Sequence, residues 1–297
     1  MGGAARRLTV MLLVTLAPLS GSAQTVESLG LPGAPRVDGI TISPSGEIFG
    51  AGTYTGSDVY RIHPDGRHDV IATGIAGPTD LDLDAAGNLY VSAFNGRAIY
   101  RITPAGDAAV HAEVPAGPAG VVVDPDGTVF VAQYGTGNGT GRSITRVDPD
   151  GRVSEFASDD RIAAPIGLTR GPDGALYVAN FYDGRIFRIG ASGEVSAFAR
   201  IYLPNGSPAP IGHLSSGGGG LVATTGRANR LYRVGPDGQV SLLAGDGSVG
   251  GTDGPVDQAT FHHPNGIAEA SDGGVYVATA GNGPGDQSVL RRVVFMR

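Results

Sequence analysis

The sequence predicts an all-β fold, a six-bladed β-propeller built from four-stranded blades. Three observations predict it: a step of the type Pro-x-Gly recurs six times, a short apolar strand follows each step, and Gly/Asp turns separate three further β-rich stretches. The steps begin at Val37, Pro78, Pro118, Pro165, Pro210 and Pro264, which lie 41, 40, 47, 45 and 54 residues apart. Periods of about 40–50 residues with strand-like content are typical of propeller blades.

Each repeat predicts four strands in the same order. In the third repeat, residues 120–123 form an apolar inner strand, and the turn at residues 125–127 leads to a second strand at 129–131. A loop of variable length precedes the third strand at 145–147, and a further turn opens the fourth strand at 153–156. Alternating β-branched and aromatic residues between Gly/Asp turns favour strands. Little helix is expected after residue 23, because no long segment has a 3.6-residue period.

The ring is expected to close through its N-terminal segment. The last repeat ends with residues 289–297, which supply a third strand and no fourth. Residues 24–30 resemble the fourth strands of other repeats, such as residues 68–74. We therefore expect the N-terminal segment to complete the last blade, since this pairing removes an exposed sheet edge.

Residues 1–23 have the architecture of a secretory signal peptide. Arg6 and Arg7 precede an apolar run at residues 8–19, and small residues at 21–23 fit a cleavage site. The run is short for a membrane span, although an uncleaved anchor is the alternative. The predicted organisation is a signal peptide at 1–23 and a propeller at 24–297, located in the periplasm or secreted.

Composition excludes several classes of function. The net charge is −7 and no Lys/Arg cluster is present, so a nucleic-acid partner is not expected. Cysteine is absent, which excludes a disulfide framework, a thiolate metal site and a cysteine nucleophile. No later apolar run approaches the length of a membrane span, so a monomer without membrane contact is expected after signal removal.

The two faces of the predicted ring differ. The Pro-x-Gly steps and the loops between second and third strands share one face, called the loop face, and these loops vary in length. Variable loops on a rigid scaffold usually carry function. The short turns lie on the opposite turn face, where their aspartates are expected to cap the turns locally. These aspartates are Asp65, Asp126, Asp150, Asp173 and Asp237.

Polar residues at the steps form a candidate metal site. The x residues are Asp38, Thr79, Ala119, Ile166, Ile211 and Asn265. Asp80 replaces the glycine of the second step, so Asp38, Asp80 and Asn265 belong to three neighbouring blades. Their oxygen atoms, with those of Asn180 approaching from across the channel, suit calcium or another hard divalent cation. The alternative is that each residue makes only local hydrogen bonds.

His213 is a separate catalytic candidate. It follows the step of the fifth repeat and begins an inner strand, so it is expected near the channel. A histidine in such a place is able to act as a general base near neutral pH.

The last repeat carries a specific resemblance. The segment from Leu243 to Ala278, including the Pro264-Asn265-Gly266 step, resembles the NHL-repeat consensus. The whole chain after residue 23 resembles the NHL and senescence-marker-protein/gluconolactonase-like six-bladed propellers. In the gluconolactonase-like family a divalent metal is held by a first-blade carboxylate, an Asn of an Asn-Gly-Leu-type step and an Asp. The resemblance maps the first two onto Asp38 and Asn265. The third has no clean match, and Asp80 is our substitute for it.

Three functional readings follow. The first is an exported, metal-dependent hydrolase of the lactonase type, in which the metal polarises the carbonyl of a small-molecule lactone and Asp38 or Asp80 is the general base. The second is a non-catalytic NHL-type module that binds a protein or glycan on the loop face. The third, ranked lowest, is a streptogramin-lyase-like enzyme. Those propellers place a channel histidine at x, and no x residue here is histidine. The fold alone does not choose between these readings.

Overall fold

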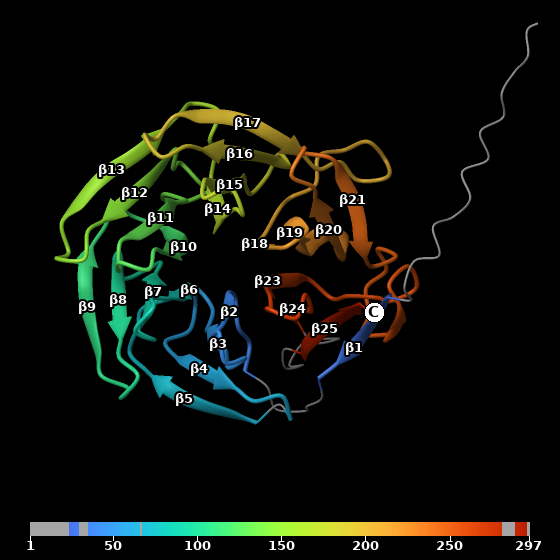
Figure 1. The fold of residues 1–297 in the computed structure, drawn as a ribbon, viewed down its shortest axis with the longest axis horizontal. Coiled ribbons are helices and arrows are strands. Elements are labelled where there is room, and N and C mark those ends of the chain that lie inside the picture. The colour runs from blue at the N-terminus through green and yellow to red at the C-terminus, as the bar shows by residue number, and fades with distance from the viewer. Residues whose placement is uncertain (1–23, 30–34, 66, 281–288, 296–297) are drawn as a thin grey trace, which may run out of the picture.

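The computed structural model describes residues 24–29, 35–65, 67–280 and 289–295, and the predicted signal peptide lies outside them. These residues form six sheets arranged as a closed ring, as Figure 1 shows. The predicted six-bladed, all-β propeller is therefore confirmed. One short 3-10 turn, η1 (Gly226–Ala228), is the helical element of the described part of the chain. Within that part, no helix has the length and apolar character needed to cross a membrane.

The first three blades each contain four antiparallel strands in chain order. Blade 1 contains β2 (Ile40–Ile42), β3 (Ile48–Ala51), β4 (Val59–Ile62) and β5 (His68–Ala72). Blade 2 contains β6 (Pro78–Leu83), β7 (Leu89–Ala93), β8 (Ala98–Ile102) and β9 (Ala108–Glu113). Blade 3 contains β10 (Pro118–Val123), β11 (Val129–Gln133), β12 (Ser143–Val147) and β13 (Val153–Ser158).

Blades 4 and 5 repeat this plan, and blade 6 combines both ends of the chain. Blade 4 contains β14 (Pro165–Arg170), β15 (Leu176–Asn180), β16 (Arg185–Ile189) and β17 (Val195–Arg200). Blade 5 contains β18 (Leu214–Gly217), β19 (Gly220–Thr225), β20 (Arg230–Val234) and β21 (Val240–Ala244). Blade 6 contains β23 (Pro264–Glu269), β24 (Val275–Thr279), β25 (Val289–Phe295), β1 (Gln24–Ser28) and the short β22 (Gly254–Pro255).

The N-terminal strand closes the ring as predicted. β1 pairs antiparallel with β25, with Val26 opposite Val293, and the two strands lie side by side in Figure 1. The two-residue strand β22 then covers the outer edge of β1, a feature that the repeat pattern did not predict. Arg291, 1% exposed, donates to Asp253, and Ser28 donates to the same carboxylate. These bonds tie the chain's first strand to its last blade.

The apolar core is divided between the blades. Six clusters of buried side chains each fill one interface between neighbouring blades, including the interface of blades 6 and 1. The second strands β7, β11 and β15 are buried throughout, because they are sandwiched on both faces. The fourth strands β5, β9 and β13 are mostly exposed. Packing of sheet against sheet therefore holds the inner strands rigidly around one axis.

The turn aspartates behave as predicted. Each accepts a hydrogen bond from the backbone N–H two residues later, in the pattern of an Asx turn. The acceptors are Asp65, Asp126, Asp150, Asp173 and Asp237. These carboxylates are occupied by local structure on the turn face.

Candidate active site on the channel axis

Asp80 and His213 occupy equivalent places in blades 2 and 5. The N–H of Asp80 donates to Ser92 Oγ at 3.1 Å, and the N–H of His213 donates to Thr224 Oγ1 at 2.9 Å. Each hydroxyl also bonds back to the carbonyl of the same residue. The repeat pattern in the sequence placed His213 one residue after the step glycine Gly212. In the structure His213 occupies the place that Asp80 has in blade 2, which is the place of the step glycine in the other blades. The reason is that β18 begins only at Leu214, without a strand at Pro210.

Blades 2 and 5 are opposite one another in the ring, so the two side chains meet across the channel axis. His213 Nδ1 lies 3.6 Å from Asp80 Oδ1, and the two side chains are only 6% and 10% exposed. The other four blades have glycine at this level: Gly39, Gly120, Gly167 and Gly266. A Cβ at Gly39 would lie 2.2 Å from Asp80 Oδ1, so the small residue makes room for the pair.

The remaining Asp80 oxygen anchors the pair to the scaffold. Asp80 Oδ2 accepts the N–H of Val121 from the inner strand of blade 3 at 2.9 Å. Burial lowers the pKa of the His213 imidazole, but the nearby carboxylates of Asp80 and Asp38 raise it by more, so the net shift is upward. The arrangement is that of an imidazole oriented by a carboxylate, which is able to accept and return a proton.

Asp38 and Asn265 meet on the loop-face side of this pair. They come from neighbouring blades 1 and 6, and Asn265 Nδ2 donates a hydrogen bond to Asp38 Oδ1. Burial raises the pKa of Asp38 to about 6, with His213 opposing the shift and Asp80 adding to it. The structure thus brings Asp38, Asp80, His213 and Asn265 into one group at the channel mouth.

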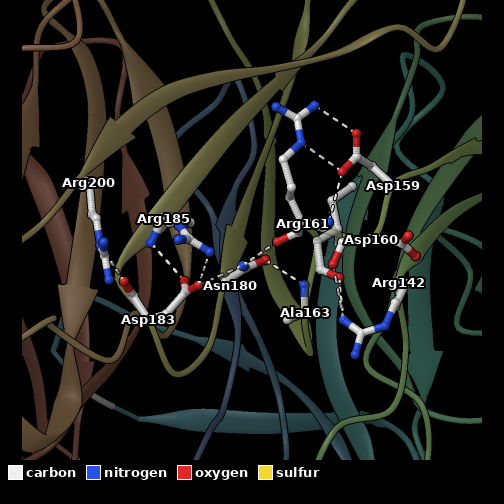
Figure 2. Close-up of polar contacts among 10 residues, drawn as sticks. Arg142, Asp159, Asp160, Arg161, Ala163, Asn180, Asp183, Arg185 and Arg200 are labelled. Atoms are coloured by element: carbon white, nitrogen blue, oxygen red, sulfur yellow. Dashed lines mark hydrogen bonds and ion pairs between the residues drawn. The ribbon is translucent and has the colours of Figure 1, made fainter.

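Asn180 does not join this group. Its side chain is fully buried and is occupied within the loop-side structure of blades 3 and 4. Asn180 Oδ1 accepts the N–H of Ala163 at 2.9 Å, while Nδ2 donates to the carbonyl of Arg161 at 3.0 Å and to Asp183 at 3.3 Å (Figure 2). Every polar atom of the amide has a partner there. The proposed approach of Asn180 from across the channel therefore has no support in the structure.

A cavity lies on the other side of the His213–Asp80 pair, toward the turn face. Its volume is about 230 Å³, and both members of the pair contribute to its wall together with Asp82, Arg170 and Ser216. Sequence reasoning missed Asp82, although the Asp80-Leu81-Asp82 alternation on one inner strand places both carboxylates on the channel side. Asp82 accepts the N–H groups of Leu83 at 2.8 Å and Val123 at 2.9 Å.

Asp82 shares the electrostatic character of the channel. Burial raises its pKa to about 6, and the backbone N–H of Val123 opposes that shift. Its hydrogen bond to Val123 joins β6 to the neighbouring inner strand β10. The bond between Asp80 and Val121 joins the same two strands two residues earlier. Both aspartates therefore link blade 2 to blade 3 while facing the channel.

The predicted metal ligands are hydrogen-bonded to one another or to backbone, which leaves few oxygen atoms free for a cation. The Asp38 carboxylate is bonded to the Asn265 amide, and one Asp80 oxygen is bonded to backbone. Among the described residues, no group of three or more His, Cys, Asp or Glu side chains is arranged to hold a metal ion. Hard cations take six or more oxygen ligands, so this donor set would need to rearrange to bind calcium.

The fold and the buried acid–base pair define a class: a six-bladed propeller with a candidate catalytic group on its axis. The chain belongs to the virginiamycin B lyase family, whose profile matches residues 30–246. A search of curated proteins finds no match.

Solved structures show similar propellers. A catalytically inactive histidine-to-alanine variant of virginiamycin B lyase from Staphylococcus aureus, with quinupristin, is 19% identical over 91% of this chain and 99% of its own, with a TM-score of 0.63. A gluconolactonase from Xanthomonas campestris is 18% identical over 90% and 88%, with a TM-score of 0.65. An auxiliary nutrient binding protein from Bacteroides thetaiotaomicron is 12% identical over 92% and 77%, with a TM-score of 0.73. These likenesses establish the fold, including the predicted gluconolactonase-like architecture.

Proposed function

We propose that the chain is an enzyme that opens a cyclic ester by elimination, with His213 as the general base and Asp80 as its orienting partner. The observation that carries the proposal is the buried His213–Asp80 contact on the channel axis. Membership of the virginiamycin B lyase family supports elimination over hydrolysis. The step pattern alone ranked a lyase lowest of the three functions, because none of the x residues of the steps is histidine.

The proposed reaction is a β-elimination at the carbon next to a carbonyl group. His213 accepts a proton from the carbon next to a carbonyl group, and the electron pair of that C–H bond forms a C=C bond. The bond from the adjacent carbon to the ester oxygen breaks, and the oxygen leaves as part of a carboxylate. Asp80 stabilises the imidazolium ion that forms, in the manner of the carboxylate in a catalytic triad. The proton then returns to solvent.

Substitution of the base tests the proposal. General acid–base catalysis contributes about 10²–10⁴-fold to rate, so His213→Gln should lower kcat by that factor with a smaller change in KM. The assay uses quinupristin as the lyase-type substrate, because a related propeller has been solved with it. The matched control is His68→Gln on the exposed strand β5, which should retain full activity. Full activity in His213→Gln, or no turnover of any cyclic ester by the unaltered protein, would contradict the proposal.

Isotope labelling separates elimination from hydrolysis, the second candidate. Gluconolactonase-type neighbours favour a test with gluconolactone alongside quinupristin. In H₂¹⁸O, elimination adds no solvent oxygen to the product, whereas hydrolysis adds one atom to the acid. An unlabelled, unsaturated product supports the lyase. A labelled product from either substrate would assign lactone hydrolysis, the activity first expected from the sequence.

Metal dependence remains a prediction. If calcium or another divalent cation binds at the mouth, Asp38, Asp80 and Asn265 would hold it after giving up their present partners, and it would polarise the substrate carbonyl. Metal analysis of the purified protein and of Asp38→Ala and Asn265→Ala checks this. Loss of bound metal in both variants supports a mouth site, and metal-free active protein would exclude it.

A further inference from the structure

The loop face is divided into an aromatic side and a basic side around the channel mouth. The residue that follows the second strand is aromatic in three consecutive blades: Phe94, Tyr134 and Phe181. In blades 1, 5 and 6 the same place holds a small residue: Gly52, Gly226 and Ala280. The repeat therefore puts large rings on one half of the rim and small residues at the same place on the other half.

The aromatic side chains form a continuous arc. Ring centroids are 5.8 Å apart for Phe94 and Tyr134, 6.1 Å for Tyr134 and Phe181, and 4.7 Å for Phe181 and Tyr182. The Tyr134 and Tyr182 hydroxyls are 2.9 Å apart, which fixes the two rings relative to each other. Tyr182 is 45% exposed, and the other three are partly exposed. We call these four residues the aromatic arc. Core packing does not account for rings left open to solvent in this way.

Basic groups occupy the facing side. Arg227 follows the second strand of blade 5, and His262 and His263 precede the step of blade 6, with ring centroids 5.1 Å apart. Burial lowers the pKa of His263, and the charges of His262, Arg227 and Arg36 lower it further, so these groups share one region. Arg227 also acts on Tyr134, whose pKa is raised by burial and by the Tyr182 hydroxyl and lowered by the arginine.

Backbone conformation points independently to His263. The residue before the step proline has positive φ in four blades, and in three of them it is small: Gly77 at 70°, Gly117 at 72° and Ala164 at 49°. His263 adopts φ 45° at the same place in blade 6. A left-handed conformation costs a residue with a side chain about 1–2 kcal/mol, a cost that glycine avoids. The chain keeps an exposed imidazole where its other left-handed repeats have glycine or alanine, as expected for a side chain retained for binding.

We propose that this rim binds a ligand that combines a flat ring with an anionic group such as a carboxylate. The ring stacks on the aromatic arc, and the anionic group lies toward the Arg227 guanidinium, with the neutral His263 imidazole as a hydrogen-bond donor beside it. Charge complementarity favours an anion, because the exposed Arg227 has no ion pair or hydrogen bond among the described residues. Such a ligand would be the substrate class of the proposed enzyme, held above His213. Only the reaction that follows binding rests on the proposed function.

Binding of unreactive probes tests the inference separately from catalysis. The probes are 2-naphthoate and its uncharged analogue 2-naphthylmethanol, measured by calorimetry at low and at moderate salt. An exposed ion pair contributes up to about 1 kcal/mol, which corresponds to about fivefold in affinity. Naphthoate should therefore bind about fivefold more tightly than the alcohol, with an advantage that shrinks as salt is added. Binding should persist in His213→Gln, even though that variant loses turnover.

Rim variants locate the site. Tyr134→Leu keeps an apolar side chain but removes the aromatic ring, and should weaken both probes about threefold to tenfold. Arg227→Gln should weaken naphthoate and leave the alcohol unchanged. His263→Gly should weaken naphthoate while Tm stays the same or rises, because the strain is relieved. Arg152→Gln, an exposed arginine on the turn face, is the control and should change nothing.

Two results would overturn the inference. One is equal affinity for naphthoate and the alcohol, or no binding of either. The other is binding that is insensitive to Tyr134→Leu and Arg227→Gln. Either result leaves the proposed lyase activity unaffected, because that activity is assigned by the His213 variant and by isotope labelling.

Discussion

Single residues on the inner strands distinguish this propeller from a purely structural ring. Four blades have glycine at the level where blades 2 and 5 have Asp80 and His213. Asp82 lies two residues after Asp80 on the same strand, and its carboxylate faces the channel and accepts two backbone N–H hydrogen bonds. Burial raises the pKa values of Asp38 and Asp82, and the neighbouring carboxylates raise the pKa of His213, so the channel is a region of perturbed proton affinity.

Asp82 should make stability depend on pH. Its pKa in the folded protein is about 6, above the ordinary value of 3.8, so the folded state holds the proton more tightly than the unfolded state. The resulting stabilisation is present below pH 4 and is lost as pH rises from about 4 to about 6. A shift of about two pKa units corresponds to about 3 kcal/mol. The free energy of unfolding of the protein minus that of Asp82→Asn should fall by about this amount across the window.

Urea unfolding from pH 4 to pH 7 provides the measurement. Asp38 shifts in the same direction but is present in both proteins, so it cancels in the difference. A difference that stays flat between pH 4 and pH 6 would show that Asp82 ionises normally in the folded protein.

At the scale of elements, the inner strands approach closely because of the step glycines. A Cβ at Gly120 would lie 2.3 Å from the carbonyl oxygen of Ile166, and one at Gly167 would lie 2.8 Å from that of Gly212. Both contacts are with backbone of the next blade, which cannot shift without moving a sheet. The Pro-x-Gly step therefore sets the distance between blades, in addition to marking the start of each inner strand.

Gly120→Ala should destabilise the protein by about 1–3 kcal/mol, since overpacking a tight interface costs that much. For a chain of this size the change lowers Tm by roughly 2–4 °C per kcal/mol. The control is Gly218→Ala, in the turn between β18 and β19, where an added Cβ meets nothing within 4 Å. Calorimetry should therefore give a lower Tm for Gly120→Ala than for Gly218→Ala. Equal Tm values would show that the blades are not held by this contact.

At the scale of the whole molecule, the repeat predicts the fold and much of the site. Six steps with β-rich spacing predict six blades, and the missing fourth strand of the last repeat predicts closure by residues 24–28. Because steps converge on one axis, the grouping of Asp38, Asp80 and Asn265 also follows from their places in the repeat. Convergence of this kind is a property of the ring and needs no detail of side-chain packing.

Other features depend on structure that the repeat does not contain. His213 faces Asp80 because blade 5 begins its inner strand three residues after Ile211, an offset that the Pro210-Ile211-Gly212 motif conceals. Asn180 was expected in the channel, but it accepts the N–H of Ala163 and donates to the carbonyl of Arg161, and these bonds hold it in the loop structure. Long-range hydrogen bonds between irregular segments leave no periodic signal in the sequence, so reasoning from repeats misses them.

Opposite blades place His213 and Asp80 in contact on the axis, and NMR titration of the His213 imidazole measures the effect of that contact. The pKa of His213 should lie above its ordinary value of 6.5 in the unaltered protein and should fall in Asp80→Asn. Asparagine can keep the Val121 hydrogen bond, so the fold is retained. A His213 that titrates at the same pH with and without the Asp80 carboxylate would contradict the account.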